Sequence, residues 1–166
     1  MASTSQATTH LPPLGTHVRE QVGDDLQATL VELLDLSLLG KQFHWSVVGH
    51  MFRELHLQLD ELVDSWRDLA DTVAERSVAI GHFPDGQAGV IAGSSPLQSL
   101  ARGPLEDQVV VRDLTDRLTA VVERARERMD RLGELDAVSQ DVLIQVVRAL
   151  EQQLWMIRVQ YSPGVA

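Results

Sequence analysis

The sequence contains no cysteine, and that absence removes several kinds of chemistry at once. A disulfide framework, a thiolate metal site and a thiol nucleophile are all excluded, and the lack of disulfides fits a reducing cytoplasm. Any metal ion bound by this chain must therefore be held by nitrogen and oxygen atoms.

Long hydrophobic runs and lysines are also scarce. No apolar stretch approaches the roughly 20 residues that a membrane span requires, and residues 1–10 lack the regions of a signal peptide, so we expect a cytoplasmic protein without membrane contact. Lysine occurs once, at Lys41, among 14 basic residues, and the net charge is −10. A field of that sign repels nucleic acid and attracts cations, which favours a metal-handling protein.

The chain has 166 residues, enough for one domain with its own hydrophobic core. We predict a flexible arm over residues 1–17, which include two adjacent prolines and no Lys or Arg. A folded domain is predicted over residues 18–161 and a short tail over 162–166. No internal repeat or second domain is visible.

Four stretches carry apolar residues every three or four positions, which is the spacing of amphipathic helices. The first is predicted to end near Gly49, and the second, which is the clearest, near Gly81. The core stripe predicted for the first helix is Leu26, Leu30, Leu33, Leu34, Leu38, Trp45 and Val48, and the stripes of the second and fourth helices include Phe52 and Trp155.

The third helix is predicted from about Leu105 to Leu132, closed by Gly133, and the fourth over about 137–161 with Asp136 as its N-cap. A Gly- and Pro-rich segment over 81–104 is predicted to be a long crossover with a short helical turn at 97–101. A crossover of that length lets the second and third helices run parallel. With no strand pattern, this is the all-α arrangement of a ferritin-like four-helix bundle.

Two pairs of potential metal ligands lie on the second predicted helix. His56 with Asp60, and Asp71 with Glu75, each have the i, i+4 spacing that places both side chains on one face. The pairs are about 16 Å apart along the helix axis, too far to share one ion. Two copies packed antiparallel about a two-fold axis would bring one pair from each copy together, with two equivalent sites per dimer.

His44, at the end of the first helix, is expected near His56 and adds a second imidazole. Two imidazoles and three carboxylates suit Fe(II) with open positions for an oxidant, and they also suit Zn(II) or Mn(II). The alternative is that these residues are ordinary surface charges, paired with the nearby arginines Arg53, Arg67 and Arg76.

These residues resemble the signature of the Dps family, the mini-ferritins also called DNA-binding proteins from starved cells. The likeness covers roughly residues 20–160. It is carried by the segment Lys41–Gly49, by Phe52, Leu55-His56, Leu59-Asp60-Glu61, Asp71 and Ala74-Glu75-Arg76, and by Leu135–Asp141 and Leu150-Glu151-x-x-x-Trp155 in the fourth helix. Standard ferritins use Glu-x-x-His repeats, which this sequence lacks.

The resemblance implies a hollow dodecamer with ferroxidase sites at two-fold interfaces between subunits. Carried over by position, His44, His56 and Asp60 come from one subunit, and Asp71 and Glu75 from its partner. The family typically oxidises Fe(II) with hydrogen peroxide and stores ferric oxide in the cavity, which suppresses hydroxyl-radical formation.

Three further residues match family positions. Trp45 corresponds to a tryptophan near the iron that could scavenge an oxidising equivalent, and packing within the bundle is the alternative. Asp136 and Asp141 correspond to an acidic pore through which iron enters, although helix capping explains them equally well.

The terminal segments depart from the family pattern. Members that bind DNA commonly do so with a Lys/Arg-rich arm, whereas residues 1–18 and 161–166 contain neither residue type. Direct DNA binding is therefore doubtful. Two alternatives to a ferroxidase remain: a nucleoid-associated protein that condenses DNA, and a cage whose metal site holds inert zinc.

Overall fold

The computed structural model describes residues 11–161, so the tail at 162–166 and the first ten residues of the predicted arm lie outside the described part. The division into arm, domain and tail therefore stays a prediction. The first helix begins at Thr16, two residues before the expected start of the folded domain. Just before it, Leu14 already packs against the core.

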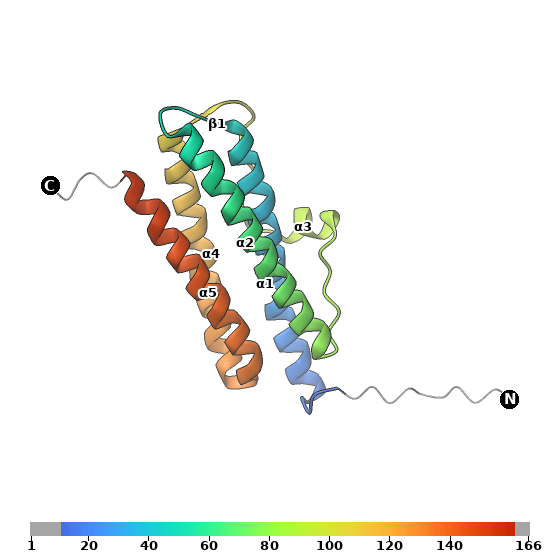
Figure 1. The fold of residues 1–166 in the computed structure, drawn as a ribbon. Helices are drawn as coiled ribbons and strands as arrows, with labels where there is room; N and C mark the ends of the chain where they lie inside the picture. The colour runs from blue at the N-terminus through green and yellow to red at the C-terminus, as the bar shows by residue number, and fades with distance from the viewer. Residues whose placement is uncertain (1–10, 162–166) are drawn as a thin grey trace.

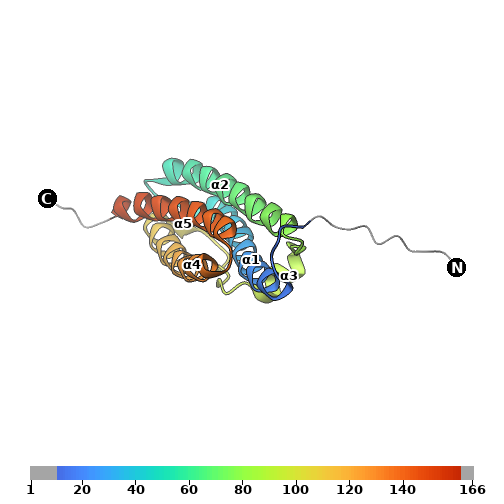
Figure 2. The same cartoon turned by 90° about the horizontal axis from the view of Figure 1, so that it is seen from below.

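Four long helices make up the body of the molecule (Figure 1). They are α1 (Thr16–Ser46), α2 (Phe52–Ala79), α4 (Asp107–Leu135) and α5 (Ala137–Arg158), and a 3-10 turn η1 (Val159–Tyr161) follows the last of them. Viewed along the bundle, α1 lies beside α2 and α4 lies beside α5 (Figure 2). Among residues 11–161, no helix combines the length and apolarity needed to cross a bilayer.

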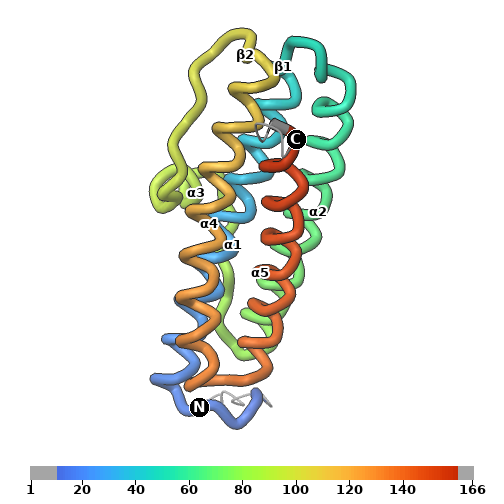
Figure 3. The backbone as a smooth tube through the Cα atoms, turned by 90° about the vertical axis from the view of Figure 1, so that its left-hand side faces the viewer, coloured from blue at the N-terminus to red at the C-terminus, as the bar shows by residue number. Residues whose placement is uncertain are grey.

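The connection between α2 and α4 returns the chain along the whole length of the bundle (Figure 3). As a result α2 and α4 run parallel, which confirms the prediction from the length of the crossover. The short helix within it is α3 (Ala88–Ser94), so the predicted turn at 97–101 is wrong. Pro96 disfavours helix in the residue before it, whereas Ile91 gives α3 one buried side chain that anchors it.

Most residues predicted to lie in the core are buried, but five of those named above are exposed. The predicted stripe of α1 is correct at Leu26, Leu30 and Leu33, whereas Leu36 and Phe43 were missed and are fully buried. The predicted core residues that are exposed are Leu38, Trp45, Val48, Phe52 and Trp155. Because α1 carries leucines on most of its faces, periodicity did not determine which face turns inward.

A small parallel ladder at one end of the bundle contradicts the expectation of no strands. β1 (Val47–Val48) pairs with β2 (Leu105–Glu106), and Val47 lies opposite Leu105. Two-residue strands are too short to show the alternation that reveals a strand in sequence. The ladder joins the end of α1 to the start of α4.

The junction between α4 and α5 differs from the prediction in one respect. α4 continues through Gly133 to Leu135, so Gly133 does not close the helix. Its lack of a side chain instead admits Gln140, whose Nε2 would lie 2.5 Å from an added Cβ. The extended backbone of Asp136 ends α4, and its side chain accepts a hydrogen bond from Ser139 N, which confirms Asp136 as the N-cap of α5.

Candidate metal centre

His44 and His56 meet where α1 ends and α2 begins. Their rings stack with centroids 3.5 Å apart. His44 Nδ1 donates to the carbonyl oxygen of His56 over 2.8 Å, and His56 Nδ1 donates to the carbonyl oxygen of His44 over 2.9 Å. Because a carbonyl oxygen can only accept, both Nδ1 atoms carry the hydrogen. In each neutral ring the free lone pair therefore lies on Nε2, the form that a metal-binding histidine needs.

Asp60 lies one turn after His56 and joins the same cluster. Its Oδ1 is 3.2 Å from His44 Nδ1 and accepts a hydrogen bond from the ammonium group of Lys41 on α1. The hydrogen bond from Lys41 holds the pKa of Asp60 below its usual value, against the opposing effect of burial. Electrostatic attraction to His44, Lys41 and His56 lowers this pKa further. The carboxylate is therefore ionised at neutral pH and ready to bind a cation.

Asp71 and Glu75 lie in the second half of α2, away from this cluster. Both side chains are exposed, and within residues 11–161 neither forms an ion pair. Arg76, one of the arginines considered as their partner, bonds instead to Asp136 over 2.7 Å. The structure thus brings together three of the five predicted ligands and leaves two apart.

No group of three or more His, Asp or Glu side chains in the described part of one chain is arranged to hold a metal ion. The ligand set as a whole stays a prediction.

A residue at the start of α4 holds the turn between the two histidines in place. Gly49 has φ 124°, a conformation that favours glycine, and an added Cβ would lie 2.5 Å from Asp107 Oδ2. The same oxygen accepts a hydrogen bond from Met51 N over 2.9 Å, and Oδ1 accepts one from Gln108 N. The carboxylate of Asp107 therefore holds the backbone that presents His44 and His56 to each other.

Comparison with known proteins places this arrangement in a family. The family described as "Ferritin-like domain" matches residues 23–162. The "DNA protection during starvation protein" of Mycolicibacterium smegmatis is 35% identical over 150 residues, covering 89% of this chain and 81% of that one. The chain belongs to the Dps family of ferritin-like proteins. The resemblance inferred from the motif is thereby confirmed.

Other relatives of this Dps-family chain agree in fold. The solved structure of Mycobacterium smegmatis Dps in a tetragonal form superimposes with a TM-score of 0.89 at 32% identity, covering 93% of each chain. This confirms the ferritin-like four-helix bundle. The "Fine tangled pili major subunit" of Haemophilus ducreyi is 34% identical, over 93% of this chain and 82% of its own length.

Trp45, next to the histidine cluster, is not part of the packing of this Dps-family bundle. Its side chain is 71% exposed, so packing within the bundle of one chain does not explain it. Phe52, which tilts against the His56 ring at 5.1 Å between centroids, is also exposed. Two exposed aromatic side chains therefore flank the cluster.

Asp136 and Asp141, the predicted pore residues, have different surroundings. Burial by itself would raise the pKa of Asp136, but hydrogen bonds from Ser139 and Arg76 outweigh it and hold that pKa below its usual value. Asp141 is exposed and accepts a hydrogen bond from Gln145. Asp136 thus has a structural role in this Dps-family fold, and the pore remains a prediction.

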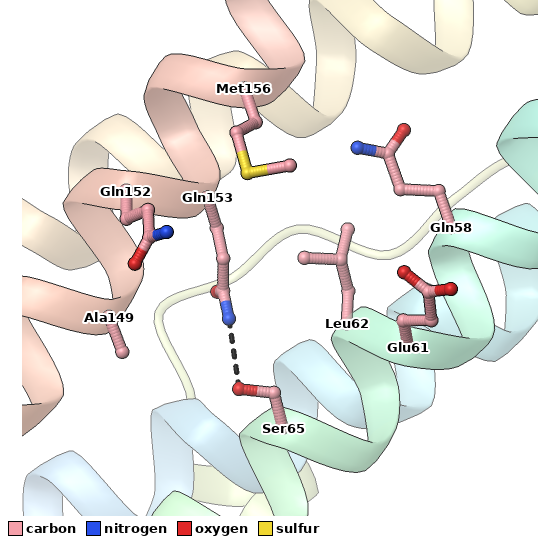
Figure 4. A pocket seen from close by; sticks show the side chains of 8 residues that line it. All are labelled: Gln58, Glu61, Leu62, Ser65, Ala149, Gln152, Gln153 and Met156. Carbon is pink, nitrogen blue, oxygen red and sulfur yellow. Dashed lines mark hydrogen bonds between the residues drawn. The ribbon is translucent and has the colours of Figure 1, made fainter.

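A separate polar pocket of about 280 Å³ lies between α2 and α5 (Figure 4). At its floor Gln153 donates to Ser65 Oγ and accepts the indole hydrogen of the buried Trp66. These bonds satisfy polar groups at the centre of the bundle. None of the five predicted ligands lines this pocket, so it is not part of the candidate metal centre.

Sequence reasoning missed the roles of Lys41 and Asp107. Lys41 stood in the family motif three positions before His44, a spacing that puts both on one helix face, and this signal could have placed it at the site. Asp107 is far from the turn in sequence, and no local pattern indicates its contact with Gly49.

Proposed function

We propose that this Dps-family protein is a ferroxidase and iron store. It binds Fe(II) at sites shared between two copies, oxidises it, preferably with hydrogen peroxide, and keeps the ferric product inside a hollow dodecamer. The observation that carries this proposal is the reciprocal hydrogen bonding of His44 and His56, which leaves the Nε2 atom of each ring free in a cluster that also contains the ionised Asp60. Iron is the substrate here.

The chemistry of the cluster suits Fe(II) with positions left for an oxidant. Two imidazole nitrogens and a carboxylate are donors of the type that non-haem iron uses. Lys41 holds the Asp60 carboxylate until a cation replaces its ammonium group. Binding of Fe(II) at Asp60 therefore requires the Lys41 ammonium group to move away. The iron cation then takes the place of the lysine's positive charge beside the carboxylate.

Completion of the site by a second copy rests on the exposed acidic pair. Asp71 and Glu75 carry negative charge on the surface without partners in the described chain. A two-fold axis near the middle of α2 would place them opposite His56 and Asp60 of another copy. The exposed Trp45 beside His44 would then be covered by the interface, close enough to the iron to donate an electron.

Oxidation by peroxide is balanced when two irons react together. Each Fe(II) gives one electron, and the peroxide O–O bond accepts both and breaks. Two protons then complete two water molecules, so no hydroxyl radical is released. Hydrolysis of the resulting Fe(III) to oxyhydroxide releases protons. Protection from oxidative damage follows from consuming both Fe(II) and peroxide.

The experiment is anaerobic loading of the purified assembly with Fe(II), followed by stoichiometric hydrogen peroxide. Ferric absorbance and hydroxyl-radical trapping are recorded together for the native protein, Asp71→Asn and Asp68→Asn. Asp68 is the matched control, because it is an exposed aspartate on the same helix outside the predicted ligand set. We expect rapid ferric formation with little radical in the native protein and in Asp68→Asn. In Asp71→Asn we expect slow ferric formation and more trapped radical.

No protein-dependent oxidation would instead support the inert cage, and the metal content of the purified assembly would then show whether zinc is bound. Equal activity in the two variants would remove Asp71 from the site.

Protection of DNA, the role named for the Mycolicibacterium smegmatis relative, is proposed here to act through iron chemistry. The net charge of −10 and the absence of Lys and Arg from residues 1–18 and 161–166 disfavour phosphate contacts. We expect no DNA retardation at physiological salt. Salt-sensitive retardation by the purified assembly would favour the DNA-condensing alternative.

A further inference from the structure

A second charged cluster lies between α1 and α4, at residues that do not belong to the candidate metal centre. A cavity of about 460 Å³ is bounded by α1, the crossover and α4, and its wall includes Glu32, Arg124 and Arg128. None of the residues proposed to bind iron lines it. It is therefore independent of the proposed function.

Glu32 is the only acidic residue buried in this wall. It is 1% exposed, and its two carboxylate oxygens accept hydrogen bonds from Arg124 Nε and from Arg128 Nη1, the latter over 2.9 Å. Arg128 is itself only 8% exposed. One carboxylate thus faces two guanidinium groups, which leaves one positive charge in excess in a cluster where Glu32 and Arg128 are buried and the Arg124 side chain is 31% exposed. Such a charge is unfavourable unless an anion accompanies it.

The hydrogen bonds are also incomplete. Arg124 Nη2 is buried and has no hydrogen-bond partner among the described residues. Arg128 uses only Nη1 to bond Glu32. Nη2 itself has almost no accessible surface, so a ligand in the cavity would contact Arg124 through the 31% of its side chain that is exposed.

One other acidic residue borders the cavity. Asp24 lies at the rim with its side chain 82% exposed, and it points toward His82, whose Nε2 is 3.9 Å from Asp24 Oδ1. Solvent screens a carboxylate at such a position. It does not offset the excess charge next to Glu32.

We propose that this cavity binds a small tetrahedral oxyanion, such as inorganic phosphate, between Arg124 and Arg128. The anion neutralises the excess charge and accepts hydrogen bonds from the guanidinium donors that Glu32 leaves free. Planar guanidinium groups are well matched to phosphate oxygens, and hydrogen bonds between charged partners are the stronger kind. Ser94, which also borders the cavity, adds a hydroxyl donor from the end of α3.

The test is titration of the iron-free assembly with inorganic phosphate, followed by phosphorus-31 NMR and calorimetry at constant ionic strength. Iron must be removed first, because ferric mineral adsorbs phosphate by itself. Arg124→Gln removes one guanidinium, and we expect at least a roughly tenfold loss of affinity. Arg126→Gln is the matched control, since Arg126 is on the same helix but is exposed and pairs with Glu151.

Ala28→Phe is the second variant, because Ala28 lines the cavity and a larger side chain fills it while both arginines remain. We expect it to abolish phosphate binding without changing the helical circular dichroism. Absence of saturable binding to the native assembly, or unchanged affinity in Arg124→Gln, overturns the proposal. If Arg124→Gln instead disrupts the assembly in light scattering and phosphate does not bind, a carboxylate of another copy is the partner, and the oxyanion site is wrong.

Discussion

In the first half of α2, His56 and Asp60 meet partners from α1, whereas in the second half Asp71 and Glu75 are exposed and form no ion pair within residues 11–161. Both halves carry potential metal ligands on one helix, an imidazole and a carboxylate in the first and two carboxylates in the second. What differs is that the first half is organised by its own chain: His44 fixes the tautomer of His56, and Lys41 keeps Asp60 ionised.

This difference suggests a division of labour. The first half of α2, with His56 and Asp60, is the histidine half. Folding of one chain already places its side chains, through contacts that the same chain supplies. The acidic half contributes charge at a surface, so it costs little to the fold and acts only when another copy faces it. Variants in the two halves should then have similar effects on iron oxidation and different effects on stability.

The largest expected effect is complementation between the two halves. His56→Ala and Asp71→Ala should each abolish protein-dependent Fe(II) oxidation, because each removes ligands from every shared site. Reassembly of an equal mixture of the two variants should restore about a quarter of the sites, those with an intact half from each copy. Peroxide-driven ferric absorbance after dissociation and reassembly measures this. No recovery, in a mixture proved by mass spectrometry to have exchanged subunits, would contradict sharing.

A smaller effect is expected from Asp107, which fixes the turn between His44 and His56. Asp107→Ala leaves Met51 N and Gln108 N without a charged acceptor, so we expect a loss of roughly 2 kcal/mol in stability and weaker Fe(II) binding. Thermal unfolding and Fe(II) titration of the iron-free assembly measure the two effects. Asp116→Ala, on an exposed position of the same helix, serves as the control. Unchanged Fe(II) affinity in Asp107→Ala would show that the turn does not position the histidines.

At the far end of α2, Arg76 is paired with Asp136, and this contact should respond to pH. The pKa of Asp136 is lowered in the folded state, so its contribution is present above the pKa of the unfolded chain and is lost as pH falls through the folded value. Asp136→Ala should cost about 1 kcal/mol at neutral pH through the lost N-cap, and less at pH 3. Melting temperatures across this pH range test the sign. A cost that grows on acidification would contradict it.

The smallest effect is expected from the acidic half itself. Asp71→Ala and Glu75→Ala should change the stability of the iron-free protein by less than about 0.5 kcal/mol, since both side chains are exposed and neither forms an ion pair within residues 11–161. His44→Ala, in the other half, should cost several times more because His44 is 8% exposed and hydrogen-bonded. Thermal unfolding in the presence of a chelator compares them. Equal losses would mean that the two halves of α2 are equally integrated into the fold.

The helices and their order were predictable because α2, α4 and α5 each have one clear apolar face. Leu55, Leu118 and Leu150, one on each of these faces, are all buried. The face of α1 was less certain, because leucines occur around most of that helix, and Trp45 was placed inward although it is exposed. Which face packs is then decided by the neighbouring helices, which a periodicity argument does not contain.

At the site, the approach of His44 to His56 was predictable from their places at two helix ends. The reciprocal hydrogen bonds were not, because they depend on where two backbone carbonyls point after the turn. The conformation of this turn depends on Gly49 and on Asp107, a residue of another helix. The stability of such a turn comes from a contact between distant parts of the chain, which no local spacing reveals.

Lys41 is the sole lysine of the chain, and it lies against Asp60 in the candidate metal centre. Apart from the terminal amine, every acylating label or amine-directed cross-linker applied to this protein therefore reacts beside the predicted iron ligands. The modification that is usually the least selective in protein chemistry becomes a single-site reporter here. Its rate, measured with and without metal, would follow the release of that ammonium group from Asp60.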